Sequence, residues 1–266
     1  MSLVTVETDV FIGFRCILQN TFIKKGVQIA SNAKIGGENP TTINKYVWIG
    51  AGAVIKGGVS IGEGAIIGAN TIVEENVPPY SIMIGQPATK LKDRNIINDG
   101  EPNFRNLINT FRINFRDAIK RKKLQKEIED RYQKGVFNFI DADIDGNLPS
   151  HLGDNVIMIG KKITDSSGKL QLDGGISIGK EVSIGDSTIV EGGGKVIIGD
   201  NVRIGKNVHI ISTSHNYNKL SLPMTLLPVM IEDDVTIEDG VKILGGVTIS
   251  KGSLVKVNSF VHKNIK

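Results

Sequence analysis

The sequence is poor in cysteine, in aromatic residues and in long apolar runs. Cys16 is the only cysteine in 266 residues, so no intramolecular disulfide can form, as is usual in a reducing compartment. No apolar run reaches the length of about 18 residues that a membrane-spanning helix needs. The first residues are too polar for a signal peptide. We therefore expect a cytoplasmic protein without membrane insertion.

Aromatic residues make up 5% of the chain, whereas 31 residues are glycine. Few large rings together with many Ile, Val and Gly residues predict a narrow, repetitive core. The net charge of +4 is small, and most of the surplus lies within residues 105–134. A chain-wide basic character is missing, so we expect no nucleic-acid partner.

Branched aliphatic residues recur at six-residue steps in two arrays, and a small or β-branched residue follows four positions after most of them. With a step of five residues before Ile23 and a step of eight before Ile43, the first array comprises Val6, Ile12, Leu18, Ile23, Ile29, Ile35, Ile43, Ile49, Ile55, Ile61, Ile67 and Val73. The second array comprises Ile178, Ile184, Val190, Ile198, Ile204, Ile210, Ile231, Ile237, Ile243, Ile249, Val255 and Val261. Each array therefore holds twelve repeats.

A period of six fits neither the 3.6 residues of an amphipathic helix nor the alternation of a single strand. It fits a three-sided coil in which each flat side uses one repeat and directs its aliphatic residue to the axis. Twelve repeats then form four coils, stacked about 4.8 Å apart through parallel β-ladders. An ordinary β-sandwich would not keep a six-residue phase. The pattern thus predicts an all-β fold with two hexapeptide-repeat arrays.

Residues 45–94 resemble the C-terminal half of bacterial sugar O-acetyltransferases of the maltose, galactoside and xenobiotic type, and residues 178–266 resemble the same family again. This resemblance implies a left-handed parallel β-helix, acetyl-CoA as co-substrate and a sugar or polysaccharide precursor as acceptor. It also implies a homotrimer with CoA in the groove between neighbours, and a role in polysaccharide biosynthesis.

Three segments follow from the repeat pattern. Residues 1–94 form the first array with a C-terminal cap, 95–177 form a linker, and 178–266 form the second array with an extruded loop at 211–230. The linker contains an amphipathic helix at about 103–134, since apolar residues recur there at three- and four-residue steps. Its basic face could bind an anionic polymer, although a solvated face is the commoner meaning.

The loop interrupts the second array between Ile210 and Ile231, and long excursions from a rigid scaffold are usually functional. In the resembling enzymes this loop carries the catalytic histidine, which matches His215, and returns through a Pro-Val-x-Ile stretch, which matches 228–231. Imidazole, with a pKa near 6.5, is suited to remove a hydroxyl proton near neutral pH. We expect His215 to be the general base, whereas a histidine that only caps a turn is the competing interpretation.

The resemblance also implies residues for CoA binding, but the two arrays divide the features of the family. These positions are Trp48, Ala69, Thr71 and Arg94 in the first array and Gly245, Gly246, Ser259 and Lys263 in the second. The first array has the cap (78–88) and no histidine, whereas the second has a histidine and no cap. Either the second array is the enzyme and the first a degenerate copy, or the two stack into one prism that carries both His215 and Trp48.

Other classes remain open. A carbonic anhydrase-like metal site of the γ class would use His209 and His215, but no third histidine has suitable spacing. The acidic run 141–146 resembles the start of an EF-hand loop, yet Leu152 stands where a ligating Glu is needed. We therefore expect no metal. An N-acyltransferase for a nucleotide-linked amino sugar and a non-catalytic scaffold are also compatible with the pattern. His209 is expected to lie on an outward position beside the loop.

Overall fold

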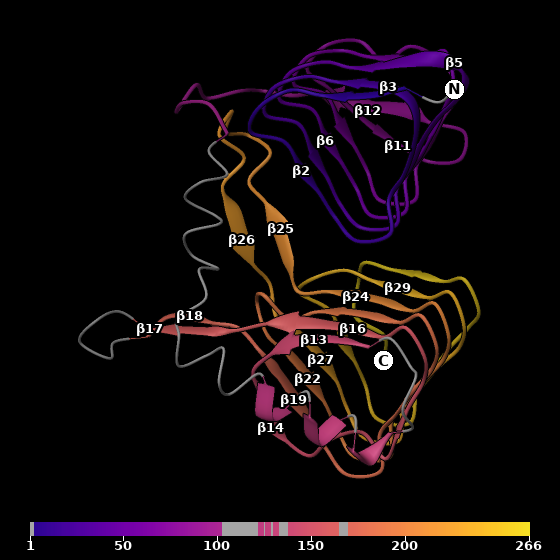
Figure 1. Ribbon diagram of the computed structural model, residues 1–266, viewed down its shortest axis with the longest axis vertical. Helices are drawn as coiled ribbons and strands as arrows, with labels where there is room; N and C mark the ends of the chain where they lie inside the picture. Colours follow the sequence, from indigo (N-terminus) through magenta and orange to yellow (C-terminus); the bar gives the residue numbers. More distant parts are fainter. Residues whose placement is uncertain (1–2, 103–121, 125, 129, 133–137, 165–169) are drawn as a thin grey trace. The chain divides into compact units, whose positions relative to one another are not determined.

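The computed structural model of the chain describes residues 3–102, 122–124, 126–128, 130–132, 138–164 and 170–266. The chain divides into two compact units. Unit 1 comprises Met1–Thr110 together with His215–Pro223, and unit 2 comprises Phe111–Ser214 together with Met224–Lys266. Each unit is built around a parallel β-solenoid (Figure 1). The expected all-β solenoid fold is confirmed.

Unit 1 contains two long ladders of strands, β1-β3-β5-β7-β10 with β8 beside β5, and β12-β11-β9-β6-β4-β2. The strands are β1 (Val4–Val6), β2 (Phe11–Ile12), β3 (Ile17–Ile23), β4 (Gln28–Ile29), β5 (Lys34–Ile43), β6 (Trp48–Ile49), β7 (Val54–Lys56), β8 (Ser60–Ile61), β9 (Ile66–Ile67), β10 (Ile72–Val73), β11 (Ser81–Ile84) and β12 (Thr89–Asp93). β5 is long enough to pair with β7 through its first residues and with β8 through its last. The coil therefore has three sides.

From Ile23 to Val73, the aliphatic residues of the first array are buried in the core of this solenoid, whereas Val6 and Ile12 of its first coil are 45% and 38% exposed. Ile29 pairs with Ile49, and Ile49 pairs with Ile67, in register across β4, β6 and β9. All three are fully buried. The outward residue Trp48 stands between Gln28 and Ile66 on the opposite side of the same strands. The six-residue prediction of the core is thus confirmed for these coils.

Unit 2 contains three ladders, β13-β16-β21-β24-β29-β32, β14-β19-β22-β27-β30 and β15-β20-β23-β28-β31. The strands are β13 (Phe139–Ala142), β14 (Ile144–Gly146), β15 (His151–Leu152), β16 (Ile157–Gly160), β17 (Lys162–Thr164), β18 (Leu170–Asp173), β19 (Ile176–Ile178), β20 (Ser183–Ile184), β21 (Ile189–Glu191), β22 (Val196–Ile198), β23 (Arg203–Ile204), β24 (His209–Ile211), β25 (Thr213–His215), β26 (Met224–Leu226), β27 (Val229–Ile231), β28 (Thr236–Ile237), β29 (Lys242–Ile243), β30 (Thr248–Ile249), β31 (Leu254–Val255) and β32 (Phe260–Val261). β17 with β18 and β25 with β26 form separate two-stranded hairpins.

In unit 2 the first described solenoid strand is β13, which starts at Phe139, before the expected boundary at residue 178. β13 pairs with β16, and β16 pairs with β21, in the register Ile140, Met158 and Val190. The β17–β18 hairpin inserts residues between two sides of this coil. This insertion breaks the six-residue phase and hides the coil from a periodicity search.

The expected helix at 103–134 falls largely outside the described residues. Helical residues are described at 122–124, 126–128 and 130–131, and Ile128 is buried in the core of unit 2. The described residues support only this short helical stretch, and they do not support the expected long helix. Within the described part of the chain, no helix has the length and apolar character to cross a membrane.

Small residues at the corners let successive coils approach closely. A Cβ atom at Gly50 would lie 2.4 Å from the backbone nitrogen of Ala69 in the next coil. A different requirement holds at Gly52, where φ is +66°, a left-handed conformation that glycine adopts without a steric penalty. Gly50 is therefore required for clearance, and Gly52 for the turn.

We predict that Ile35→Ala lowers the free energy of unfolding of unit 1 by about 2–5 kcal/mol, because it leaves a cavity in the core. Ile35 is 2% exposed on the inward side of β5. Urea unfolding, followed through Trp48 fluorescence, measures the change. Lys34→Ala, on the outward side of the same strand, is the control, and equal effects of the two variants would contradict the inward assignment.

Candidate active site

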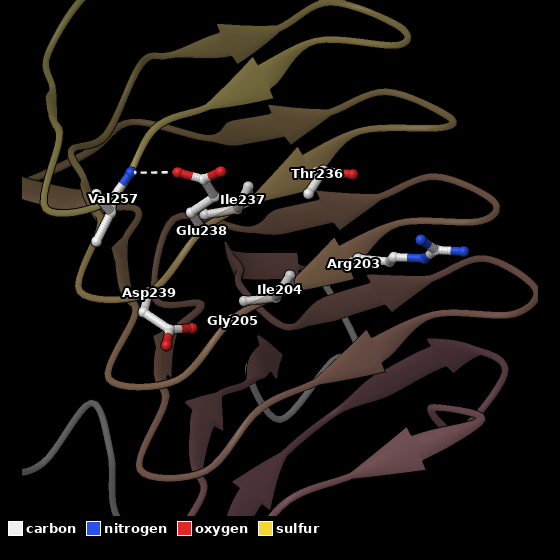
Figure 2. Close-up of a pocket in the computed structure, with 8 residues that line it drawn as sticks. All are labelled: Arg203, Ile204, Gly205, Thr236, Ile237, Glu238, Asp239 and Val257. Carbon is white, nitrogen blue, oxygen red and sulfur yellow. Dashed lines mark hydrogen bonds between the residues drawn. The ribbon is translucent and has the colours of Figure 1, made fainter.

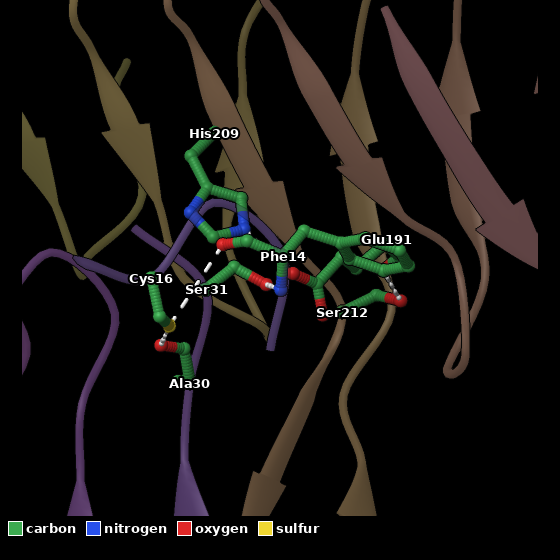
Figure 3. A network of polar contacts seen from close by, with 7 residues as sticks. All are labelled: Phe14, Cys16, Ala30, Ser31, Glu191, His209 and Ser212. Atoms are coloured by element: carbon green, nitrogen blue, oxygen red, sulfur yellow. Dashed lines mark hydrogen bonds and ion pairs between the residues drawn. The ribbon is translucent and has the colours of Figure 1, made fainter. Parts of the chain in front are cut away.

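The β25–β26 hairpin leaves unit 2 at a well-anchored base. Ser212 is fully buried and accepts a hydrogen bond from the Gly194 backbone N–H at 2.9 Å. Its hydroxyl donates to the Glu191 carbonyl at 2.8 Å (Figure 3). A Cβ atom at Gly194 would lie 2.0 Å from the Ser212 carbonyl oxygen. The hairpin therefore starts from a fixed point of the solenoid, where only glycine fits beneath it.

His209 lies next to this base but is not at the surface. Its side chain is fully buried, and Nε2 lies 2.8 Å from Glu191 Oε1 (Figure 3). His209 does occupy the expected outward face of β24, opposite to the inward Ile210, but its side chain is buried, so the interpretation as a plain surface histidine is wrong. Among the described residues, no group of three His, Cys, Asp or Glu side chains could hold a metal ion.

Arg94 holds the tip of the hairpin. Its Nε donates to the Tyr217 carbonyl at 2.5 Å, and Nη2 donates to the Lys219 carbonyl at 2.7 Å. Nη1 donates to the Gly64 carbonyl, at a corner of the first array, at 2.8 Å. The residue is only 5% exposed, and this burial lowers the pKa of the guanidinium. One side chain thus fastens the hairpin tip to a coil within unit 1.

The segment that follows Arg94 adds further bonds to the tip. The Ile97 N–H donates to the Asn218 carbonyl at 2.8 Å, and the Leu220 N–H donates to the Ile97 carbonyl at 3.0 Å. Ser221 donates to the Asp99 carboxylate through its backbone N–H at 3.1 Å and its hydroxyl at 2.7 Å. These two bonds from Ser221 lower the pKa of Asp99. The tip therefore pairs with the segment at 97–99 in the way that a strand pairs with its neighbour.

His215 points back into this tip. Its Nδ1 lies 2.7 Å from the Leu222 carbonyl oxygen, which can only accept a hydrogen bond. A proton on Nδ1 leaves the lone pair of the neutral imidazole on Nε2. Burial of the ring lowers the pKa of His215 below its ordinary 6.5, and the bond to Leu222 opposes this shift only in part. Near neutral pH the ring is therefore an uncharged base.

Two aromatic rings surround the His215 imidazole. The centroid of Trp48 lies 5.8 Å from that of His215 and 5.2 Å from that of Tyr217, with the Tyr217 ring edge-on. The His215 and Tyr217 centroids lie 6.5 Å apart. The structure thus brings His215 and Trp48, predicted from separate arrays, into contact within unit 1.

The other residues expected in the first array to bind CoA have structural contacts. Arg94 donates to three backbone carbonyl groups, so we do not propose it as a CoA ligand. Thr71 is fully buried among the inward residues, where a ligand in a groove cannot reach its side chain. Ala69 stands at a corner turn and is half-buried. Only Trp48 of this set contacts His215.

In the second array, Gly245 and Gly246 lie beneath the return of the hairpin. A Cβ atom at Gly245 would lie 2.6 Å from Leu227 Cβ, and the Gly246 N–H donates to the Leu227 carbonyl at 3.1 Å. Ser259 is half-buried, and Lys263 is exposed. The glycines therefore have a packing role that the sequence did not reveal, whereas Ser259 and Lys263 remain open to a ligand.

A shallow pocket of about 420 Å³ lies elsewhere in unit 2 (Figure 2). Its lining is Arg203, Ile204, Gly205, Thr236, Ile237, Glu238, Asp239 and Val257. Glu238 accepts a bond from the Val257 N–H at 2.7 Å, and Asp239 accepts one from the Lys206 N–H at 2.7 Å. With one cation and two carboxylates, this lining does not suit the phosphates of CoA.

Both arrays match hexapeptide-repeat families. Residues 40–75 match the family described as bacterial transferase hexapeptide (six repeats). Residues 3–37 and 195–214 match the hexapeptide repeat of succinyl-transferase. The matched residues lie in both units, and the sequence families therefore agree with the two solenoids.

Two curated relatives are enzymes that acetylate different molecules. Chloramphenicol acetyltransferase of Klebsiella aerogenes is 46% identical over 54 residues, which are 20% of this chain and 26% of that protein. Serine acetyltransferase of Escherichia coli K12 is 37% identical over 82 residues, which are 30% of each protein. The chain thus spans less than a third of the length of these relatives.

Two solved structures match parts of the chain at low similarity. A hexapeptide-repeat acetyltransferase of Vibrio cholerae, in complex with acetyl-CoA, is 24% identical and has a TM-score of 0.34 over 54% of this chain and 68% of that one. A serine acetyltransferase in complex with cysteine is 26% identical, with a TM-score of 0.32 over 34% and 41%. The chain therefore carries hexapeptide repeats over residues 3–37, 40–75 and 195–214, and these repeats lie on parallel β-solenoids.

Proposed function

We propose that the chain transfers an acetyl group from acetyl-CoA to a hydroxyl group of a sugar or polysaccharide precursor, with His215 as general base. The observation that carries the proposal is the state of the His215 ring. Its Nδ1 is fixed on the Leu222 carbonyl, which leaves Nε2 as the acceptor, and burial lowers its pKa. A neutral, oriented imidazole is what deprotonation of a hydroxyl requires.

The proposed reaction needs no covalent enzyme intermediate. Nε2 takes the proton of the acceptor hydroxyl while its oxygen attacks the thioester carbonyl carbon. The tetrahedral intermediate then collapses, the C–S bond breaks, and the imidazolium returns its proton to the CoA sulfur. The products are the acetyl ester and CoA, and His215 is neutral again.

Acetyl-CoA as the donor is supported by the relatives whose names are acetyltransferases. Ser259 and Lys263 are the residues of the second array that we propose for CoA binding, since both are accessible. Trp48 is the proposed contribution of the first array. Each array thus has its own candidate residues for the donor.

The identity of the acceptor is less constrained than the identity of the donor. The relatives act on chloramphenicol and on serine, as their names state, so similarity alone does not choose an acceptor. The sugar hydroxyl rests on the resemblance of residues 45–94 to sugar O-acetyltransferases. A nucleotide-linked amino sugar is the second candidate acceptor. Acetyl transfer to its amine, and not to a hydroxyl group, would favour this candidate.

We predict that His215→Ala lowers acetyl transfer by about 10²–10⁴-fold, the usual contribution of a general base. CoA release against a panel of sugars and nucleotide-linked sugars measures the change. Binding of CoA should persist, because the variant removes the base and not the donor site. His151→Ala, which changes an exposed histidine of unit 2, is the matched control. Transfer that survives in His215→Ala at the wild-type rate would exclude the general-base role.

We also predict the pH dependence of kcat/KM. Only the neutral imidazole accepts a proton, and burial places the pKa of His215 below 6.5. The rate should therefore be flat above this value and fall tenfold per pH unit below the lowered pKa. An acid limb with its midpoint above 6.5 would contradict the buried, neutral base.

Finally, we propose that the protein forms a homotrimer, as the resembling enzymes do. Light scattering after size-exclusion chromatography should give three times 28.8 kDa, which is the chain mass. A monomer that retains full transfer activity would show that a single chain completes the site.

A further inference from the structure

We infer that Arg94 is a positioning residue for His215, which makes the segment at 94–99 part of the catalytic apparatus. The inference rests on the proposed function, since it concerns the same histidine. It goes beyond that proposal because it assigns the orientation of the base to a residue 121 positions earlier in the chain. The constraint passes in three steps, from Arg94 to the tip, from the tip to Leu222, and from Leu222 to His215.

The guanidinium of Arg94 is committed to protein groups. Nε, Nη1 and Nη2 each donate to a backbone carbonyl, and the residue is 5% exposed. A buried arginine with such a set of acceptors is costly to unpair, because its charge would lose these bonds without regaining water. Arg94 therefore fixes the positions of the carbonyl groups that it contacts.

The Lys219 carbonyl passes this constraint to Leu222. It accepts a hydrogen bond from Arg94 Nη2 at 2.7 Å and another from the Leu222 N–H at 3.2 Å. Leu222 has a φ of +49°, a left-handed conformation that is costly for a branched side chain. Such a conformation persists only where the surroundings determine it. The side chain of Leu222 is 2% exposed, so packing contributes as well.

The conformation of Leu222 decides where its carbonyl points, and this carbonyl receives His215 Nδ1. A change at Leu222 would release the ring, allow the other tautomer and admit water. Asp99 provides a second, independent anchor for the same turn through the two bonds from Ser221. The first array is then more than a degenerate copy, since Arg94 at its C-terminal end joins the Gly64 carbonyl of the array to the tip that orients the base.

Trp48 is the only tryptophan in the chain and contacts both His215 and Tyr217. Its fluorescence therefore reports docking of the tip without any assay of activity. We would compare Arg94→Lys and Arg94→Met with Lys92→Met, which changes an exposed cation of β12. An ammonium group cannot donate to three separated carbonyls in the planar geometry of guanidinium, so both Arg94 variants should loosen the tip.

In both Arg94 variants, we expect a red-shifted Trp48 emission, stronger acrylamide quenching and faster trypsin cleavage after Lys219. The value of kcat/KM should fall by about 10²-fold, as for a misplaced catalytic group. CoA affinity should stay the same. The acid limb of the pH profile should move up toward 6.5, because a ring in water loses its desolvation. A purely structural role for Arg94 would not move this limb.

The outcomes separate the inference from the proposed function. Trp48 emission and Lys219 cleavage that match Lys92→Met would overturn the anchoring by Arg94. A loosened tip with unchanged kcat/KM and pH limb would overturn the positioning role, while the general base would stand. If Arg94→Met fails to fold by circular dichroism, Arg94→Lys and Ser221→Ala decide. Activity of His215→Ala at the wild-type level would instead refute the proposed function, whatever Trp48 reports.

Discussion

Each coil of the two solenoids satisfies its backbone N–H and C=O groups only through another coil of the same cross-section. This constraint fixes the inward aliphatic columns, such as Ile184, Ile204 and Ile237, because a coil of another size would lose its ladder. Extra residues must therefore leave at a corner. In unit 2 both hairpins do so between the same two ladders, after β16 and after β24. The position of the functional excursion thus follows from the rigidity of everything around it.

A hairpin that leaves the solenoid also leaves its source of hydrogen-bond partners. The tip at 216–222 would be free to take many conformations, each with its own orientation of His215, and a base needs one. Arg94 and Asp99 supply the missing partners from a segment that lies outside the repeats. Apart from the Ser221 hydroxyl, the tip groups that take part are backbone carbonyls and a backbone N–H, so the bonds constrain the path of the chain itself. Side-chain identity at the tip then matters mainly at Tyr217, Ser221 and Leu222.

The sequence predicts those parts that repeat. The six-residue phase identified the inward positions of both arrays, and the interruption after Ile210 located His215. Thr71 shows the limit of resemblance, since the same phase places it among the small inward positions while the family comparison suggested a ligand contact. The hydrogen bonds from Arg94 to the tip could not be predicted from the sequence. The two partners of Arg94 in the tip lie 123 and 125 positions away, and a single contact at such a distance has no period.

The state of His215 combines two opposing effects. The Leu222 carbonyl favours the protonated ring, whereas burial favours the neutral one and is the larger effect. Water at the ring would reverse this order, since it would remove the desolvation and leave the hydrogen bond in competition with solvent. The low pKa is therefore a consequence of the docked tip rather than a property of the histidine. For this reason the anchoring at 94–99 controls both the orientation of the His215 ring and its protonation. A change that releases the tip must therefore alter both properties together.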